Sequence, residues 1–440
     1  MNNTWALVVT AKASIENIKI FLDHHLKLGV NEIFLFLDSP EDFNNIDELN
    51  INEKIKIFPC TDEFWRTRDH YEILDTEPNK KPKAVEQRQY HNMLHAQDVS
   101  KSEWIMMIDI DELLYSGERI NEILSEIPTN VFSVRAAPLE AVYLENKPKN
   151  LLEVFNTSYF KNRFVVNYSF WNEIYKNKYL NHKSGFFGHV TGKTFHRVNV
   201  LIRSASCHIS RPYDTDLMCA LDNNRFFILH FESMTQEFFI EKNLKRISNE
   251  FYVPFLEKKS KERLSYFKEN YEKDGEGFLE KIYMDMHVFN TKTMNKCLES
   301  GYITNINFYE FKDEAYIETY HGTIIVFNRE KEEVVAIRKE DFNKNLHCKV
   351  LIYNTLDGNN VSQKAYLYTK VDGKVCYLYL NNKNKITLIN TKKAQLFEFI
   401  RNKSFFSLGL NGKFLKCKKN NEVKLEADII NNWELFKVNF

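Results

Sequence analysis

Short apolar runs and segments with helical spacing alternate along the first part of the chain. Apolar runs over residues 5–10 and 32–38 are typical of buried strands. Between them, four aliphatic residues recur on one face of a predicted helix: Ile15, Ile18, Leu22 and Leu26. Ser14 can cap the start of this helix, and Gly29 lies where a helix-ending glycine belongs. Strand, helix and strand in this order predict a βαβ unit, whose ligands bind beyond the carboxyl ends of the strands.

Another apolar run, Trp104–Ile108, ends on the acidic residues Asp109, Asp111 and Glu112. Burying Asp109 or Asp111 alone would cost roughly several kcal/mol, so both should face a cleft or a cation. If the strand continues through them, their side chains project to the same side. Paired carboxylates suit Mg²⁺ or Mn²⁺, which would keep open positions for a diphosphate. The alternative is that Asp-x-Asp occurs here by chance.

Further residues are expected at the same edge of the sheet. Polar or small residues end the first two predicted strands: Thr10, Ala11 and Asp38. A predicted helix over residues 83–99 leads into the acid-ended strand and carries Gln87 and Arg88 among its polar side chains. These two residues either reach a ligand at the sheet edge or belong to a plain surface helix.

The remainder of the chain changes character twice. Residues 150–200 are aromatic and basic with weak periodicity, so we expect an irregular acceptor-side region there. Residues 235–298 show a helical, charged pattern. From about Asp313, short strand-like runs are separated by turn dipeptides, as in all-β proteins. We therefore expect an α/β domain, a helical bracing segment and an all-β domain, over residues 1–250, 251–312 and 313–440.

The last part also contains a rough internal repeat of about forty residues. Residues 368–377 and 407–415 carry similar Gly-Lys strands, and these units close on residues 396–399 and 433–436. A weaker copy begins near Tyr320. The pattern resembles fascin-like and lectin-like β-trefoils, and this resemblance implies a β-trefoil domain. Such a domain would serve either sugar recognition or docking.

Composition excludes several classes of protein. Lys and Arg number 60 and Asp and Glu number 60, so no global field draws the chain to nucleic acid. Seven scattered cysteines without metal-ligand spacing indicate free thiols in a reducing compartment: Cys60, Cys207, Cys219, Cys297, Cys348, Cys376 and Cys417. The first residues lack signal-peptide features, and no apolar run approaches the ~18 residues of a membrane span. We therefore expect a cytoplasmic protein that meets any lipid substrate from one side.

The blocks of the first 250 residues resemble the glycosyltransferase family 2-like and family 92 enzymes, which share the GT-A fold. The family's His-x-x-x-Gly-Val helix is matched at His25, Gly29 and Val30. Its Trp-Ile-x-x-Asp-x-Asp-Glu-Phe/Leu block is matched closely over residues 104–113. Its later His and Ser, followed by a helix with Phe and Lys, are matched less specifically at His230, Ser233, Phe238 and Lys242.

This resemblance implies transfer of a hexose from a nucleotide-diphosphate sugar, expected to be a UDP-sugar, with Mn²⁺ or Mg²⁺ as cofactor. The implied metal ligands are Asp109, Asp111 and His230. The implied nucleotide and diphosphate contacts are Thr10, Ala11, Asp38, Gln87, Arg88, Asp109, Lys193, Lys242 and Arg246. The acceptor would be a glycan or glycolipid. The Lys-, Asn- and Ile-rich composition further suggests bacterial polysaccharide or lipopolysaccharide synthesis, in the cytoplasm or at the cytoplasmic face of the inner membrane.

The chain departs from the family pattern in two places. Residues 12–15 stand where the family often has Asn-Glu near the nucleotide, so that acidic contact is missing or displaced to Glu16. No acidic pair matches the family's usual general base. A base is still needed to deprotonate the acceptor hydroxyl, and Glu140 is the first candidate and Asp214 the second. A base acting opposite the leaving group would make the enzyme inverting.

Alternatives remain for both residues and function. His230 ends an apolar run and is equally compatible with a core histidine, while Lys242 and Arg246 are compatible with a solvated helix face. One competing function is an inactive GT-A domain whose trefoil binds carbohydrate. Another is a metal-dependent phosphotransferase or nucleotidyltransferase that uses the same acids. The sequence names neither the sugar, the linkage nor the oligomeric state.

Overall fold

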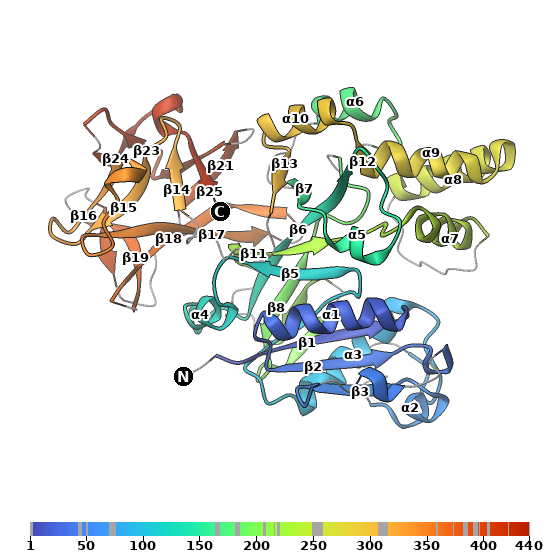
Figure 1. The fold of residues 1–440 in the computed structure, drawn as a ribbon. Coiled ribbons are helices and arrows are strands. Elements are labelled where there is room, and N and C mark those ends of the chain that lie inside the picture. The colour runs from blue at the N-terminus through green and yellow to red at the C-terminus, as the bar shows by residue number, and fades with distance from the viewer. Residues whose placement is uncertain are drawn as a thin grey trace.

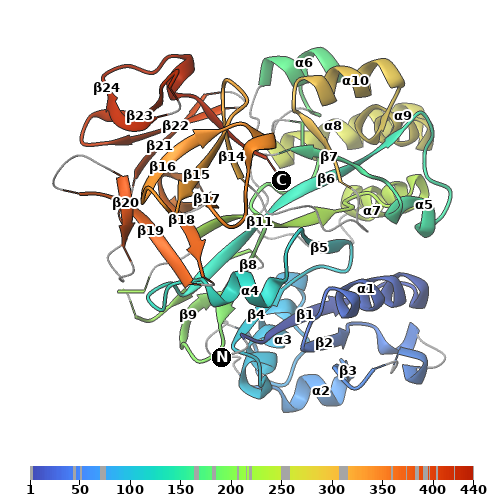
Figure 2. The same ribbon diagram turned by 60° about the vertical axis from the view of Figure 1, so that its left-hand side comes forward.

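A computed structural model of the chain shows three parts: an α/β part, a group of helices and an all-β part (Figure 1). A second view, turned from the first, shows the same three parts, with the N-terminal strands and the all-β part on different sides of the molecule (Figure 2). The structure describes residues 3–42, 46–49, 52–69, 76–162, 168–180, 185–205, 208–214, 216–217, 221–248, 258–306, 316–357, 360–372, 374–381, 386–389, 395, 397–402, 405–420 and 422–439.

Strand β1 (Trp5–Ala11) lies inside a parallel sheet. It pairs on one side with β2 (Glu32–Leu37) and on the other with β4 (Trp104–Met107), and β3 (Ile55–Pro59) pairs with β2. Every residue of β2 and β4 is buried. Continuous apolar runs suit strands that are covered on both faces. The predicted strands are confirmed, and β4 delivers the acidic residues to the carboxyl edge of this sheet.

Helix α1 (Ile15–Lys27) connects β1 to β2 as predicted. The hydroxyl of Ser14 accepts a hydrogen bond from the backbone N–H of Asn17, which satisfies one of the free donors at the helix start. Gly29, at φ +92°, lies just past the helix end. Both predicted helix boundaries are therefore confirmed.

A short helix, α2 (Asp62–Thr67), lies between β3 and the next long helix. The Thr61 side chain caps this short helix, and Trp65 is buried with 1% exposure, so a single anchoring aromatic residue orders the segment. Helix α3 (Val85–Val99) follows, close to the predicted limits.

The sheet continues beyond β4 through antiparallel and parallel neighbours. Strand β8 (Lys193–Arg197) pairs with β4, β6 (Ser133–Leu144) pairs with β8, β11 (Leu221–His230) pairs with β6, and β5 (Glu112–Ser116) pairs with β11. This mixed order places the end of β11 beside the beginning of β5. The acid turn after β4 is thereby brought next to a histidine more than a hundred residues away.

Smaller elements complete the α/β part and the helical group. The short strands are β7 (Tyr159–Asn162), β9 (Ile202–Ala205), β10 (Ser210–Pro212), β12 (Val288–Phe289) and β13 (Ile303–Asn305). The remaining helices are α4 (Ile120–Ser125), α5 (Leu151–Phe155), α6 (Tyr168–Tyr175), α7 (Gln236–Ile247), α8 (Lys258–Asp274), α9 (Glu276–His287) and α10 (Thr291–Glu299). The region over residues 150–200, expected to be irregular, thus holds several short regular elements. Helices α6 to α10 share one apolar core with β12 and β13.

The all-β part shows one pairing scheme three times. Its strands are β14 (Tyr316–Thr319), β15 (Ile324–Asn328), β16 (Glu333–Ile337), β17 (His347–Asp357), β18 (Asn360–Val371), β19 (Lys374–Leu380), β20 (Ile386–Ile389), β21 (Phe397–Asn402), β22 (Phe405–Leu410), β23 (Lys413–Cys417), β24 (Val423–Ala427) and β25 (Phe436–Asn439). Hairpins β15–β16, β19–β20 and β23–β24 alternate with the pairs β17–β18, β21–β22 and β25–β14. The predicted all-β character is confirmed, and one apolar cluster fills this part.

Strand β11 also joins the two sheets. Its residues Asp222 and Asn223 pair with Asn354 and Tyr353 of β17. The guanidinium of Arg225 contacts the carboxylates of Glu118 and Glu126 and donates to the Tyr368 hydroxyl at 2.7 Å. This junction is buried and polar, because the Arg225 side chain is only 2% exposed.

Some sequence expectations fall outside the described residues. The predicted domain boundaries lie within residues 249–257 and 307–315, and Cys207 and Cys219 also lie outside the described part. Among the described cysteines, Cys60, Cys297, Cys348 and Cys417 are free thiols. Among the described helices, none has the length and apolar character needed to cross a bilayer.

Candidate functional site

The acidic residues lie in a tight turn directly after β4. The backbone N–H of Ile108 still pairs with Val8 O, but the strand then gives way to a turn in which Glu112 N–H donates to Asp109 O at 3.1 Å. The Asp109 N–H donates in return to Glu112 Oε2 at 2.9 Å. Strand alternation therefore does not govern Asp109 and Asp111, and the prediction that one strand projects both to the same side was wrong. The carboxylates of Asp109 and Asp111 contact different side chains.

Asp109 is held by two side chains from different elements. Gln89 Nε2, on α3, donates to Oδ1 at 2.5 Å, and Lys193 Nζ, on β8, donates to Oδ2 at 2.5 Å. Burial alone would raise the pKa of Asp109, but the Lys193 charge outweighs it and lowers the pKa below its ordinary value. Asp109 is therefore a carboxylate that is already paired with a buried cation.

Asp111 faces a second group, formed where β11 ends. His230 Nε2 lies 3.9 Å from Asp111 Oδ2 and 3.2 Å from Glu232 Oε2. Lys242 Nζ, on α7, contacts Glu232 Oε1 at 2.9 Å. Two carboxylates and one imidazole thus converge from the turn after β4 and the segment after β11. Asp111 and His230 were both predicted as metal ligands, and the structure places them together; Glu232 was not predicted.

Burial and charge oppose one another in this group. Burial raises the pKa of Asp111 to about 6, although the charges of His230 and Lys242 act against the shift. Burial also lowers the pKa of His230, but the Glu232 hydrogen bond and the Asp111 charge outweigh it and raise the pKa to about 9. The imidazole is therefore cationic near neutral pH, and its proton supplies the positive charge that two neighbouring carboxylates require.

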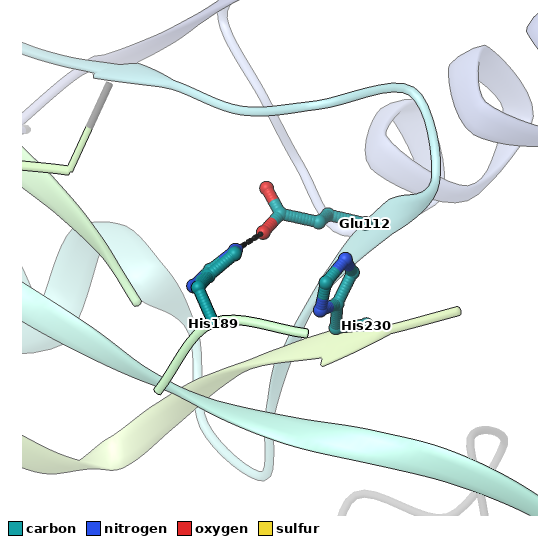
Figure 3. A group of neighbouring side chains, drawn as sticks. All are labelled: Glu112, His189 and His230. Atoms are coloured by element: carbon teal, nitrogen blue, oxygen red, sulfur yellow. Dashed lines mark hydrogen bonds and ion pairs between the residues drawn. The ribbon is translucent and has the colours of Figure 1, made fainter. Parts of the chain in front are cut away.

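A second histidine, His189, lies beside His230 and Glu112 (Figure 3). His189 Nε2 lies 3.0 Å from Glu112 Oε1, and the His189 and His230 ring centroids are 4.8 Å apart. The His208 ring also lies against His189, with centroids 4.3 Å apart and planes tilted by 53°, and His208 Nδ1 is hydrogen-bonded to Gly192 O at 2.9 Å. Burial, together with the charges of His230 and Lys193, holds the pKa of His189 well below its ordinary value. His189 and Glu112 were not predicted as site residues.

The residues predicted to bind a nucleotide form a neighbouring cluster at the ends of β1 and β2. Both Asp38 oxygens accept hydrogen bonds from Arg88, each at 2.8 Å. Thr10 Oγ1 accepts from Asn92 Nδ2 at 2.8 Å, and Ala11 contributes its backbone carbonyl to Asp38 N–H. The structure therefore brings Thr10, Ala11, Asp38 and Arg88 together.

Helix α3 contributes a different glutamine from the one predicted. Gln87 is only half-buried, whereas Gln89 is 7% exposed and bonds Asp109. Gln89 and Asn92 are three residues apart, so they share one helix face, and that face meets the sheet edge. This spacing was the signal in the sequence that could have identified Gln89.

Basic residues surround Glu232 on the helical side. The charges of Lys242 and, to a smaller extent, Arg246 lower the pKa of Glu232 against the effect of burial. Arg263 of α8 donates to Phe187 O at 2.9 Å, and its pKa is lowered to about 10 by burial and by the Arg246 charge. Lys242 and Arg246 were predicted, whereas Arg263 was not. Cations in excess over carboxylates here favour an anionic ligand.

The two predicted general bases lie in very different surroundings. Glu140 is fully buried, pairs with Lys161 Nζ at 2.8 Å and accepts the backbone N–H groups of Phe187 and Gly188. With all these contacts made, the geometry favours a structural role for Glu140 over that of a base. Asp214 is exposed in the loop after β10, where its carboxylate accepts Asp216 N–H at 2.9 Å.

Two overlapping donor sets in the described residues have ligand atoms within 4.8 Å of one another: Asp111 with His230 and Glu232, and Glu112 with His189 and His230. The set of Asp111, His230 and Glu232, with two carboxylates and one imidazole, fits Mn²⁺ or Mg²⁺ better than a thiolate-seeking metal. Asp109, also predicted as a ligand, is in neither set. His230 Nδ1 is buried without a hydrogen-bond partner among the described residues, so this polar group is not fully satisfied by the protein alone.

Comparisons with known proteins assign no family. No family model matches the chain, and no curated protein matches it. Among solved structures, the chain is similar at 10% identity to "SeviL bound to asialo-GM1 saccharide", over 28% of this chain and 94% of that chain, with a TM-score of 0.21. It is also similar at 10% identity to "Crystal structure of GalNAc-T7 with UDP, GalNAc and Mn2+", over 99% of this chain and 81% of that chain, with a TM-score of 0.25. Both TM-scores are too low to support an assignment.

Proposed function

We propose that the chain is a metal-dependent glycosyltransferase with a GT-A catalytic domain. One observation carries this proposal: Asp111, His230 and Glu232 converge at the carboxyl edge of the parallel sheet, next to basic residues. That edge is where α/β sheets bind their ligands. A diphosphate leaving group needs a cation and further positive charge around it, and both can be supplied there.

Asp111, His230 and Glu232 would hold a divalent cation, with Mn²⁺ proposed ahead of Mg²⁺ because one donor is an imidazole. When bound, such a cation acts as a Lewis acid on the phosphate oxygens of the donor. Lys242 lies 2.9 Å from Glu232 and, with Arg246, supplies positive charge to the diphosphate side. Asp109 stays ionised beside Lys193, so this pair would orient the ribose or a water molecule rather than compete for the cation.

The donor is proposed to be a UDP-sugar whose nucleoside lies over Thr10, Ala11 and Asp38. Arg88 orients the Asp38 carboxylate by two hydrogen bonds, and Lys81 Nζ lies 3.5 Å from Oδ1, so Oδ2 is the oxygen proposed to accept from the nucleoside. Gln87 stays a proposed contact at the start of α3. Transfer of the hexose to a glycan or glycolipid is proposed to invert the anomeric carbon. Asp214 is the better of the two candidate bases, because it is exposed whereas Glu140 is enclosed.

The all-β part is proposed to be a β-trefoil that follows the GT-A domain and the helical segment. The support is its pairing scheme, which occurs three times and closes through β14 and β25. The domain limits 1–250, 251–312 and 313–440 are kept as part of the proposal. So is a role in bacterial surface polysaccharide or lipopolysaccharide synthesis, in the cytoplasm or at the inner membrane.

The decisive experiment replaces the metal-binding carboxylate of the acid turn. Full-length protein is incubated with Mn²⁺ and a panel of nucleotide sugars, and release of nucleoside diphosphate is measured. Asp111→Ala should lower the best activity by roughly 100-fold or more, because the charge of the leaving group is then no longer balanced. The control is Asp23→Ala on α1, whose exposed carboxylate pairs with Lys27.

Three results would contradict the proposal. Turnover that is unchanged in Asp111→Ala would remove the metal role. Phosphate retained on the acceptor would identify a phosphotransferase instead. Binding of glycan without turnover of any nucleotide sugar would favour an inactive catalytic domain.

A further inference from the structure

A row of buried polar side chains crosses four neighbouring strands behind the candidate site. In the strand register, Lys161 of β7 lies opposite Glu140 of β6, Glu140 opposite His230 of β11, and His230 opposite Glu112 of β5. Residues directly opposite one another share a face of the sheet, so basic and acidic groups alternate along this row. The side-chain exposures are 0%, 0%, 2% and 0%. His230 and Glu112 belong to the candidate site, but Lys161 and Glu140 have no role in it yet.

Both oxygens of the Glu140 carboxylate accept hydrogen bonds from backbone N–H groups. Oε1 accepts Phe187 N–H at 2.9 Å, and Oε2 accepts Gly188 N–H at 2.7 Å. Lys161 Nζ balances the charge at 2.8 Å and also donates to Met286 O near the end of α9. A buried carboxylate that loses its partners is costly, so the pair and the segment it holds form one unit.

The segment held by Glu140 is the one that reaches the candidate site. A Cβ atom on Gly188 would lie 2.8 Å from His230 Cε1, so the Gly188 backbone rests directly against that imidazole. The next residue, His189, bonds Glu112 at 3.0 Å. A shift of Gly188 by a few tenths of an ångström would therefore move a contact of both histidines.

We propose that Glu140, with its charge balanced by Lys161, is a positioning residue that orients His230 and His189 through the backbone of Phe187 and Gly188. This inference rests on the proposed function, since it gives Glu140 a role toward the metal-binding group. Outer contacts of this kind fix the orientation of metal-binding side chains, and their loss typically costs 10- to 100-fold in metal affinity. In this proposal Glu140 acts without contact to cation or substrate, because its oxygens bond Lys161 and the backbone N–H groups of Phe187 and Gly188.

The chain offers a closely matched control. Glu32 also pairs with a lysine, Lys56, and accepts two successive backbone N–H groups, those of Lys101 and Ser102, each at 2.9 Å. Glu32 begins β2, whereas the acid turn follows the end of the parallel β4, so Glu32 lies at the opposite edge of the sheet. Glu140→Gln and Glu32→Gln both place an amide donor against other donors, but only the first does so behind the two histidines.

The test measures Mn²⁺ affinity by calorimetry on the full-length variants, together with the thermal unfolding midpoint. Glu140→Gln should weaken Mn²⁺ binding about tenfold or more. Glu32→Gln should lower the unfolding midpoint but keep Mn²⁺ affinity within about twofold, because it acts away from the site. If Glu140→Gln alone does not fold, Glu140→Gln combined with Lys161→Met removes both buried charges and carries the same expectation.

Equal Mn²⁺ affinity in Glu140→Gln and Glu32→Gln would overturn the inference and leave the proposed function intact. A wild-type protein that binds no Mn²⁺ would contradict the proposed function instead. The positioning role is then read from the ¹⁵N shifts of the His189 imidazole, which reports its bond to Glu112. A change in Glu140→Gln that is absent in Glu32→Gln supports the inference, and unchanged shifts in both variants overturn it.

Discussion

At the scale of single residues, the ionisation of His230 sets the charge of the candidate site. Its pKa, raised to about 9 by Glu232 and Asp111 against the effect of burial, keeps a proton on the imidazole at neutral pH. A metal ion can bind this nitrogen only after the proton leaves. Proton and metal ion therefore compete for His230 Nε2, the imidazole nitrogen that faces Asp111 and Glu232.

We predict that Mn²⁺ binding releases protons and strengthens with pH. Between about pH 6 and 9, affinity should rise by roughly tenfold per pH unit, because His230 gives up its proton only near its pKa of about 9. Below about pH 6 it should weaken further, since Asp111, with a pKa of about 6, becomes protonated as well. Calorimetry in buffers of different ionisation enthalpy counts the released protons. Affinity that is constant from pH 6 to 9 would contradict this assignment.

Residue types alone indicated part of this site. Asp111 follows an apolar strand and His230 ends another, and both patterns place polar groups at strand ends where ligands bind. Glu112 follows the same apolar strand as Asp111, but its place beside His230 is set by strand register. His189 and Glu232 carry no comparable signal, and they join the site through side-chain contacts with Glu112 and His230.

At the scale of elements, the segment over residues 185–192 shapes the candidate site without regular secondary structure. Tyr175 donates to Gly185 O at 2.9 Å, Glu140 holds Gly188, and Gly192 begins the approach to β8 at φ +78°. A Cβ atom on Gly192 would lie 2.1 Å from Ala136 O. Close approach of two backbones therefore requires glycine at this position.

We predict that Gly192→Ala lowers the free energy of unfolding by more than about 2 kcal/mol, since left-handed strain adds to a backbone clash. Gly412→Ala is the matched control, because Gly412 has φ +74° with open space around its Cβ position. It should cost only about 1 kcal/mol from strain alone. Urea unfolding followed by tryptophan fluorescence measures both. Equal losses of unfolding free energy in the two variants would show that the close approach to Ala136 O adds no cost to Gly192→Ala.

At the scale of the whole molecule, one strand links the candidate site to the all-β part. Strand β11 ends at His230 and begins beside β17, and Arg225 lies between these points in a buried cluster with Glu118, Glu126 and Tyr368. Tyr368 is fully buried and packs in the apolar core of the α/β part. The two parts are therefore expected to unfold together.

We predict that Arg225→Met separates the unfolding of the two parts. Without the Arg225 guanidinium, the negative charges of the largely buried Glu118 and Glu126 carboxylates are no longer balanced, which costs roughly 3–5 kcal/mol of stability at the junction. Calorimetry should show one transition in the wild type and two in the variant. Arg329→Met, in an exposed pair with Asp372, should keep one transition. A single transition in Arg225→Met would show that the junction does not couple the parts.

The sequence by itself determined the elements whose signals are local. Apolar runs, the Ser14 cap and Gly29 predicted β1, α1 and β2, because burial and capping act within a few residues. The turn dipeptides likewise indicated the all-β part. Asn411-Gly412 is an example, because glycine readily adopts the positive φ, here +74°, that a tight turn between two strands requires. The acidic residues after β4 could likewise be identified from the sequence, because they directly follow an apolar run.

Only the tertiary structure decided which distant residues meet. His230 reaches Asp111 through strand order, Lys193 neutralises Asp109 from β8, and Glu140 turns from a candidate base into a buried partner of Lys161. No local pattern encodes these pairs, because buried charges are tolerated only where the whole fold supplies a partner.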